Sequence, residues 1–365
     1  MESSKNDPVG SREAALGPLH SLRSYQSWAS TARALLEPAW MDAYLALARA
    51  LPVQGASYYA ELRLAEPQQL DLLLSLDCYC SPNVASQIAE RRLGRGPEAA
   101  WAWERALGIL RRWTSPDSDL RGTISTIWLE FDDVRTPLDD VAPSLSACLI
   151  GGYRADPAAL PRTSAPAEVA SVTSAYRALA GDAWDVHSHH LLDWCARALP
   201  SGGRIIHLSL MAAREPKSVK LYIVLPREEL RAYLTRVDFC GPHALVEEAL
   251  AQLMPADLTG DHLYVDLNLA NMHDAGLATL GLAFTPQQLL LDPGRERTLH
   301  GLVRAGQCDE AAAEALRAWQ RGDQKRGGEP WLDLKTVVGG ARRSIATKAY
   351  LGMGVTGGPW ARGGS

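Results

Sequence analysis

The stretch SVKLYIVL, Ser218 to Leu225, contains the pattern that decides the fold. Its side chains change character at every step, which is the two-residue period of a β-strand with two different faces. Lys220 and Tyr222 share one face. The other face is aliphatic and consists of Val219, Leu221, Ile223 and Leu225. The aliphatic face needs a cover of helices. A charge beside an aromatic ring is unusual on a strand face that simply meets solvent, so the second face is expected to line a site.

Five other strand-like runs show the same division into an aliphatic face and a polar, aromatic face. Along these runs the polar and aromatic residues again fall on one side: Tyr59, Glu61 and Arg63; Trp128, Glu130 and Asp132; Tyr264, Asp266 and Asn268; Asp333 and Lys335; Lys348 and Tyr350. Successive side chains of a strand point to opposite faces, so the members of each set are expected to lie together.

A helical stretch precedes each pair of strand-like runs, which gives one helix–strand–strand unit that occurs five times. The predicted helices lie at about 25–50, 83–113, 168–199, 226–253 and 286–321. The predicted strands lie at 57–64, 70–80, 125–132, 144–153, 204–211, 218–225, 261–270, 277–284, 331–338 and 345–353. Short polar turns join the strands in four of the five pairs, and such turns predict antiparallel hairpins rather than parallel crossovers.

The predicted fold class is therefore α+β, with five helix–strand–strand units and about ten antiparallel strands. Open sheets and a closed αββα-type barrel with the helices outside both satisfy this pattern. Closure is favoured because it places the polar, aromatic faces in a wide lumen. The expected organisation has two helix–hairpin halves, at 24–153 and 169–353, which a linker at 154–168 connects. A disordered segment at 1–23 is expected before them and a flexible glycine-rich tail at 354–365 after them.

Composition narrows the class of protein. The chain has 365 residues, of which 47% are hydrophobic and 22% charged, and these ordinary values exclude global disorder. A net charge of −5 argues against a dedicated binder of nucleic acid or of anionic membranes. Eleven Trp and eleven Tyr against three Phe favour a binding cavity, because Trp and Tyr combine an apolar ring with a polar atom.

The distribution of apolar residues and cysteines predicts a cytoplasmic protein that does not enter a membrane. No apolar run approaches the ~20 residues of a membrane-spanning helix, and residues 1–23 do not resemble a signal peptide. The six cysteines include no CxxC pair and are expected to be free thiols in a reducing compartment.

Three local motifs point to metals or nucleotides but have simpler interpretations. GMGVTG at 352–357 matches GxGxxG, yet no helix follows it to receive a pyrophosphate. The histidines of DVHSHHLLDW at 185–194 have helical metal-ligand spacing, although a solvated helix face is the favoured interpretation. DDVRTPLDD at 132–140 is interpreted as a charged turn. No metal and no cofactor are therefore expected.

The two Lys-x-Tyr pairs, Lys220 with Tyr222 and Lys348 with Tyr350, are the sharpest signal for a site. Two ammonium groups and two phenols facing one lumen can hold an anion. The alternative is that these lysines are solvated strand residues that prevent edge pairing. The candidate ligand-binding residues are Tyr59, Glu61, Arg63, Trp128, Glu130, Asp132, Lys220, Tyr222, Tyr264, Asp266, Lys335, Lys348 and Tyr350. No catalytic residue is identified.

Five helix–strand–strand units with Lys-x-Tyr pairs on lumen faces resemble the αββα barrel of the aromatic prenyltransferases. That resemblance covers about 300 residues in element order. It implies that Arg, Lys and Tyr side chains in the lumen hold a prenyl diphosphate. It also implies that a carboxylate serves as the base for an aromatic acceptor.

The motifs WLEFD at 128–132 and KAYLG at 348–352 resemble a bacterial group associated with ribosomal-peptide natural products, including the peptide-binding proteins of crocagin biosynthesis. This resemblance implies recognition of a precursor peptide, with other maturation enzymes as partners. The first hypothesis is therefore a protein that binds a precursor peptide and presents it for, or assists, a modification such as cyclisation. A prenyltransferase that uses a prenyl diphosphate and a structural scaffold are the alternatives. The sequence leaves open whether the protein is an enzyme.

Overall fold

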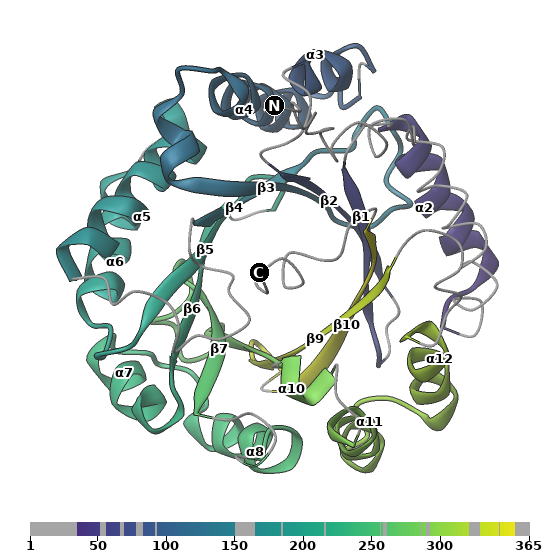
Figure 1. Cartoon of the computed structure of the whole chain (residues 1–365), viewed down its shortest axis with the longest axis vertical. Helices are drawn as coiled ribbons and strands as arrows, with labels where there is room; N and C mark the ends of the chain where they lie inside the picture. The colour runs from purple at the N-terminus through teal and green to yellow at the C-terminus, as the bar shows by residue number, and fades with distance from the viewer. Residues whose placement is uncertain are drawn as a thin grey trace, which may run out of the picture.

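Ten strands close into one antiparallel barrel, and the helices form a ring around it (Figure 1). The computed structural model describes residues 35–51, 56–65, 69–77, 83–91, 93–149, 165–183, 185–214, 217–255, 257, 261–284, 286–289, 293–320, 329–342 and 344–354. The order of strands around the barrel is β1-β10-β9-β8-β7-β6-β5-β4-β3-β2. The predicted α+β fold is confirmed, and of the two arrangements considered, the closed barrel is the one observed.

The strands follow the sequence pattern closely. They are β1 (Ser57–Arg63), β2 (Leu70–Asp77), β3 (Ile124–Phe131), β4 (Ser144–Leu149), β5 (Arg204–Met211), β6 (Ser218–Pro226), β7 (His262–Asn268), β8 (Thr279–Ala283), β9 (Glu329–Gly339) and β10 (Ser344–Gly354). The helices are α2 (Pro38–Ala50), α3 (Val84–Ala89), α4 (Pro97–Thr114), α5 (Ala165–Ala180), α6 (Val186–Arg197), α7 (Leu230–Arg236), α8 (His243–Leu253), α10 (Pro286–Leu289), α11 (Gly294–Arg304) and α12 (Glu310–Gln320).

The predicted helical stretches are divided into shorter helices, and specific residues explain the breaks. α3 ends at Ala89, and the connection that follows contains Gly94 with a φ of +62°, a conformation outside the α-helical range; Pro97 then occupies the first turn of α4. The side chain of Asp185 accepts a hydrogen bond from the Ser188 amide at 2.9 Å and so starts α6. Pro242 is the N-cap of α8 and separates it from α7. The predicted beginning of the first helix, at residue 25, lies outside the described residues.

The domain boundaries expected from the sequence fall largely on residues that are not described. Residues 1–23, most of the linker at 154–168 and the tail beyond Gly354 are outside the described part, and α5 already begins at Ala165. None of the described helices is long and apolar enough to cross a bilayer. Four cysteines lie in the described part, and none of them is in a disulfide.

The hairpin connections give the barrel two different ends. Each of the five hairpins, β1–β2, β3–β4, β5–β6, β7–β8 and β9–β10, pairs antiparallel neighbours. Because neighbouring strands alternate in direction all around the barrel, the five turns lie at one end, which we call the hairpin end. The chain connects to the surrounding helices at the opposite end, which we call the helix end.

The apolar core lies between the barrel wall and the helices. Leu62, Leu221 and Leu351, from three different strands, are each 2% exposed or less. Trp113 of α4 is also buried, and its indole N–H donates to the Ile124 carbonyl at 3.0 Å, which ties α4 to β3. Each fully buried leucine stabilises the fold by about 1.5–3 kcal/mol. The helices therefore fix the barrel from outside, and the lumen is left to polar and aromatic side chains.

Closure of the barrel depends on a close approach between β1 and β10. Gly352 is the register partner of Tyr59, and a Cβ atom at Gly352 would lie 2.2 Å from Cε1 of the Tyr59 ring. We expect Gly352→Ala to lower the free energy of unfolding by about 1–3 kcal/mol, because the ring would have to move within a packed wall. Urea denaturation measures this change.

Gly108→Ala is the matched control. Gly108 lies within α4, and apart from the backbone of its own helix no atom of the described residues lies within 4 Å of the position that its Cβ would take. This substitution should leave stability unchanged or raise it by about 0.5–1 kcal/mol, since alanine is the better helix former. Equal destabilisation by the two substitutions would contradict the close contact at the β1–β10 closure.

Candidate functional site

A cavity of about 440 Å³ opens at the hairpin end of the lumen. Its walls include residues from β1, β6, β7, β8, β9 and β10, close to the turns that join these strands. The charged residues that line it are Arg63, Lys220, Lys335, Arg342, Lys348 and Asp266. Five cations thus face one carboxylate in the same cavity, and an anionic ligand is the chemistry that this balance favours.

Lys335 forms the most deeply buried ion pair of the lumen. Its Nζ lies 3.1 Å from Oδ2 of Asp266 and donates to the Tyr222 hydroxyl at 2.6 Å. The same ammonium group lies 5.0 Å from the centre of the Tyr222 ring and 5.3 Å from that of Tyr350. Burial opposes ionisation of Asp266, but Lys335 and then Lys220 hold the pKa of this carboxyl below its usual range.

This pair joins β7 to β9 across the intervening strand β8, and Gly281 makes the crossing possible. A Cβ atom at Gly281 would lie 2.8 Å from the Cβ of Asp266 and 3.2 Å from Cδ of Lys335. A larger residue would therefore displace one partner of the pair. The sequence pattern around Gly281 carries no signal of this role, because the contact depends on the strand order.

A second buried ion pair joins β10 to β1. Lys348 donates to Oε1 of Glu61, whose side chain is 8% exposed. Burial disfavours the charged form of Glu61, but Lys348 and Lys335 outweigh it and hold the pKa of the carboxyl below its usual range. Glu61 and Asp266 are thus both carboxylates at neutral pH, each beside a lysine.

The remaining cavity cations differ from Lys335 and Lys348 in their surroundings. In the described part of the chain, no acidic group lies within ion-pair distance of Arg63, Lys220 or Arg342. Arg63 and Arg342 are exposed at the rim, whereas Lys220 is half-buried. Burial, followed by repulsion from Arg214, Lys335 and Lys348, lowers the pKa of Lys220 to about 8, although Asp266 opposes the shift.

Carboxylates gather on the other side of the lumen, around Asp71 of β2. Asp71 is the register partner of Glu61, and its Oδ1 accepts from the Gln69 side chain at 2.9 Å and from the Asp133 amide at 2.8 Å. Burial, and then repulsion from Glu61 and Asp132, raises the pKa of Asp71 to about 7. Asp132 itself is held by Arg214 through contacts of 2.6 and 2.5 Å. Sequence reasoning missed Asp71, although an acidic residue enclosed by the leucines of LDLLLSLD, at its second position, was a usable signal.

Toward the helix end the lumen is lined by aromatic rings. The Tyr59 and Trp128 ring centres lie 4.8 Å apart, and the Trp128 indole N–H donates to Sγ of Cys148 at 3.2 Å. Cys148 in turn contacts Nε2 of His207. Burial, with a further contribution from Lys335, lowers the pKa of His207 to about 3, so its imidazole is neutral at physiological pH.

The thirteen predicted site residues therefore fall into connected groups. Arg63, Lys220, Asp266, Lys335 and Lys348 line the cavity. Most of the other predicted residues contact these residues or one another within the lumen. Glu61 contacts Lys348, Tyr222 and Tyr350 contact Lys335, and Tyr59 contacts Trp128. Glu130 accepts from Ser146 of β4, Asp132 pairs with Arg214, and Tyr264 packs with Ile206 and Val224. Arg214, Arg342, Asp71 and Gly281 are further lumen residues that the sequence analysis did not select.

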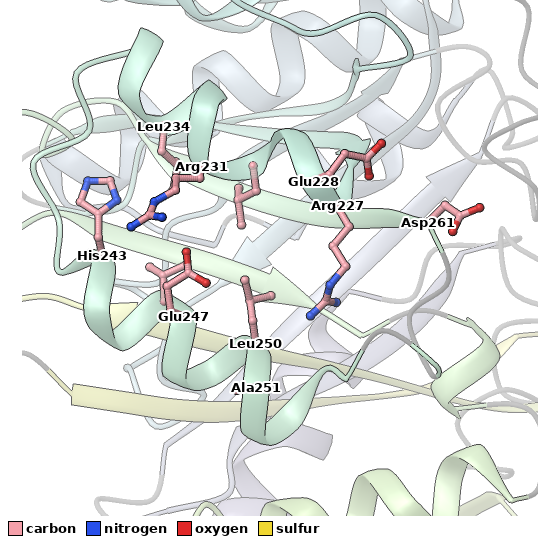
Figure 2. A pocket seen from close by; sticks show the side chains of 11 residues that line it. Arg227, Glu228, Arg231, Leu234, His243, Glu247, Leu250, Ala251 and Asp261 are labelled. Atoms are coloured by element: carbon pink, nitrogen blue, oxygen red, sulfur yellow. The ribbon is translucent and has the colours of Figure 1, made fainter.

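A second pocket, of about 490 Å³, lies outside the barrel between α7 and α8. Figure 2 shows Arg231, His243 and Glu247 near one end of it, while Arg227 and Asp261 lie toward the other. Charges of both signs line it, and most of these side chains are exposed. The lumen is the stronger candidate because its charges are buried, paired and surrounded by aromatic rings.

The motifs with metal-ligand spacing do not form a metal centre in the described part of the chain. No three His, Cys, Asp or Glu side chains there gather closely enough to hold an ion. Asp193 of the histidine-rich helix α6 pairs instead with Arg197, with Nε and Oδ2 2.8 Å apart.

Neither a known protein family nor a curated protein sequence matches this chain. Several solved structures share its fold. One is 5-dimethylallyl tryptophan synthase from Streptomyces coelicolor in complex with DMASPP and Trp, with a TM-score of 0.51, 16% identity and coverage of 91% of this chain and 92% of that one. Prenyltransferase PriB, in a ternary complex with L-tryptophan and dimethylallyl thiolodiphosphate, has a TM-score of 0.51, 14% identity and coverage of 92% and 96%. AnaPT from Neosartorya fischeri has a TM-score of 0.50, 9% identity and coverage of 94% of both chains.

These matches show that the chain has the ten-stranded barrel fold of the aromatic prenyltransferases. The expected resemblance in fold is thereby confirmed. The resemblance to peptide-maturation proteins stays a prediction.

Asp71 provides a test of the electrostatics in the lumen. Its folded-state pKa lies above its unfolded value, so ionised Asp71 destabilises the fold, and this penalty grows as the pH rises from about 4 to 7. Asn at this position keeps the oxygen that accepts two hydrogen bonds and removes the charge. We expect the stability advantage of Asp71→Asn over the wild type to grow by about 3 kcal/mol between pH 4.5 and 8.5.

Urea denaturation across this pH range measures the difference. Asp117→Asn is the control, because Asp117 is exposed and lies outside the lumen. An advantage of Asp71→Asn that stays constant with pH would contradict the crowding of carboxylates around Glu61.

Proposed function

We propose that this protein transfers a prenyl group from a prenyl diphosphate to an aromatic acceptor bound in the barrel lumen. The observation that carries the proposal is the cavity at the hairpin end, where five cations face one carboxylate and lead into a lumen lined by tyrosine and tryptophan. The shared fold with the aromatic prenyltransferases supports it.

The cavity suits a diphosphate because its cations differ in their partners. Lys335 and Lys348 are already compensated by Asp266 and Glu61. Lys220, Arg63 and Arg342 are left to compensate a ligand, and three cations suit a diphosphate with roughly three negative charges. Charge-assisted hydrogen bonds from these groups would stabilise the diphosphate as the bond to carbon breaks.

The aromatic lumen suits the transfer itself. When the C1–O bond of a prenyl diphosphate breaks, positive charge develops on the allylic carbons, and the faces of tyrosine and tryptophan rings stabilise such a cation. Tyr222 and Tyr350 already lie against the Lys335 ammonium group. Enclosure by the barrel wall also keeps water from capturing the cation.

A carboxylate is needed to take up the proton that leaves the aromatic carbon once the new carbon–carbon bond has formed. Glu61 and Asp266 are both ionised in the lumen, and Oδ1 of Asp266 has no hydrogen-bond partner among the described residues. Either group can accept the proton, and the adjacent lysine keeps it ionised until then.

A ribosomally made precursor peptide is the second candidate ligand, either as the aromatic acceptor or as a chain bound for a different modification. The acidic side of the lumen, around Glu61, Asp71 and Asp132, favours it, because an acceptor with positive charges or a zwitterionic backbone complements both sides of the lumen. Other maturation enzymes would then be the partners of this protein.

Calorimetry with dimethylallyl thiolodiphosphate, which does not react readily, tests the first step. We expect a dissociation constant of about 1 μM or below, which corresponds to about −8 kcal/mol. Lys220→Met should weaken binding by about 1–3 kcal/mol, since a charge-assisted hydrogen bond is lost and no ion pair is broken. Affinity should also decrease above about pH 8, as free Lys220 loses its proton.

Lys217→Met is the matched control, because Lys217 is exposed and lies over the Trp101 ring, outside the cavity. Lys348 is less suitable for this test, since its removal would leave Glu61 buried without its partner. Tight binding should be followed by the mass increase of one prenyl group on L-tryptophan or on a peptide with an aromatic residue. The second candidate would be favoured if the protein bound a precursor peptide but not the thiolodiphosphate, and if pyrophosphate did not weaken the binding of the peptide.

A further inference from the structure

Lys220 differs from the two other lysines of the lumen. The chain has only six lysines, and three of them, Lys220, Lys335 and Lys348, line the same cavity. Lys335 and Lys348 each contact a carboxylate, which stabilises the ammonium form. The register partners of Lys220 are Ser209 on β5 and Asn268 on β7, neither of which carries a charge. Among the described residues, Lys220 is therefore the one lysine of the three that has no acidic group within ion-pair distance.

We propose that Lys220 is a nucleophilic amine that forms an imine with a carbonyl compound carrying a phosphate or carboxylate group. This is an activity additional to prenyl transfer and does not depend on it. The neutral amine adds to the carbonyl carbon to form a carbon–nitrogen bond, and loss of one water then gives the imine. Each imine formed thus releases one water molecule, and the step involves no oxidation or reduction.

The electrostatic surroundings of Lys220 favour the neutral amine. Three cations face it, namely Arg214 after β5, Lys335 on β9 and Lys348 on β10, and Asp266 on β7 is the carboxylate that opposes them. Lys335 already occupies Oδ2 of Asp266. Burial and these cations lower the pKa of Lys220 to about 8, so a substantial fraction of the amine is neutral near pH 7.5. A lysine beside other cations is a known way of making this side chain nucleophilic at neutral pH.

Two further features supply what imine formation needs. Oδ1 of Asp266 is buried and has no partner among the described residues, and Asp266 lies diagonally across β6 and β7 from Lys220. It can take the proton from the attacking nitrogen and return it to the departing oxygen. Arg63 and Arg342 at the rim attract the anionic group of the ligand. The predicted ligand class is thus an aldehyde or ketone with an anionic group.

Pyridoxal 5′-phosphate, an aldehyde with a phosphate group, is a suitable probe for the full chain. The protein is incubated with it at pH 7.5, the imine is trapped with borohydride, and the label on each lysine is quantified by peptide mass spectrometry. Lys220 should be labelled at least tenfold faster than the exposed Lys217. A pKa of about 8 raises the neutral fraction more than a hundredfold over an ordinary lysine, and the lower basicity offsets part of this gain.

Three comparisons make the test specific. Lys220 should be labelled before Lys335 and Lys348, which share the cavity but are ion-paired. Pyrophosphate should slow the labelling, and pyridoxal, which lacks the phosphate, should react more slowly. The rate at Lys220 should level off above about pH 8, whereas an unperturbed lysine would keep gaining reactivity toward pH 10. Lys220→Arg keeps the charge and should abolish the fast labelling in the cavity, leaving the slower reaction of Lys335 and Lys348.

Labelling of Lys220 no faster than Lys217, or equal labelling of the three cavity lysines, would overturn the proposal. Its failure is distinct from failure of the proposed prenyl transfer. Selective labelling of Lys220 by a protein that does not bind dimethylallyl thiolodiphosphate would support the reactive amine and contradict the transferase.

Discussion

Closing ten strands into one barrel forces every second side chain of each strand into a common enclosed space. Charges inside that space lose much of their hydration and must find partners within it. The lumen meets this constraint by pairing Lys335 with Asp266 and Lys348 with Glu61. Both lysines line the cationic cavity at the hairpin end, while the aromatic rings of Tyr59 and Trp128 lie toward the helix end.

The lumen lysines are not all paired with carboxylates, and this difference between them determines which ligands the site can bind. A lumen in which every lysine had a carboxylate would offer no net attraction for an anion. A lumen without carboxylates would be too costly to fold, because like charges would repel one another in a medium of low dielectric. Here two lysines are compensated, Lys220 is not, and Asp71 is protonated over part of the physiological pH range. In the folded state the charged forms of Lys220 and Asp71 are thus disfavoured, and a ligand of opposite charge can stabilise them.

Sequence periodicity predicted the strands and their lumen faces, because a two-residue alternation is a local property that reflects burial on one side. It placed Lys220 beside Tyr222 and Lys348 beside Tyr350 without knowledge of the strand order. The contact between Lys335 and Asp266 was beyond its reach, since these residues are 69 positions apart and lie on either side of β8. Gly281 was missed for the same reason. Gly94 and Pro242 could have predicted the breaks between helices, but the helical periodicity on either side of them was read as one continuous helix.

The position of the five hairpin turns at one end has a consequence for how such a protein can change over time. Some turn residues pack against the surrounding helices, as Val141 does by accepting a hydrogen bond at 2.8 Å from the Trp103 indole N–H of α4, whereas others are exposed at the rim. Arg342, which is exposed in the turn between β9 and β10, can be replaced without disturbing the packing of α4 or α8. Selection for a new ligand can therefore act on exposed turn residues at the rim, while the buried ion pairs of the lumen stay unchanged.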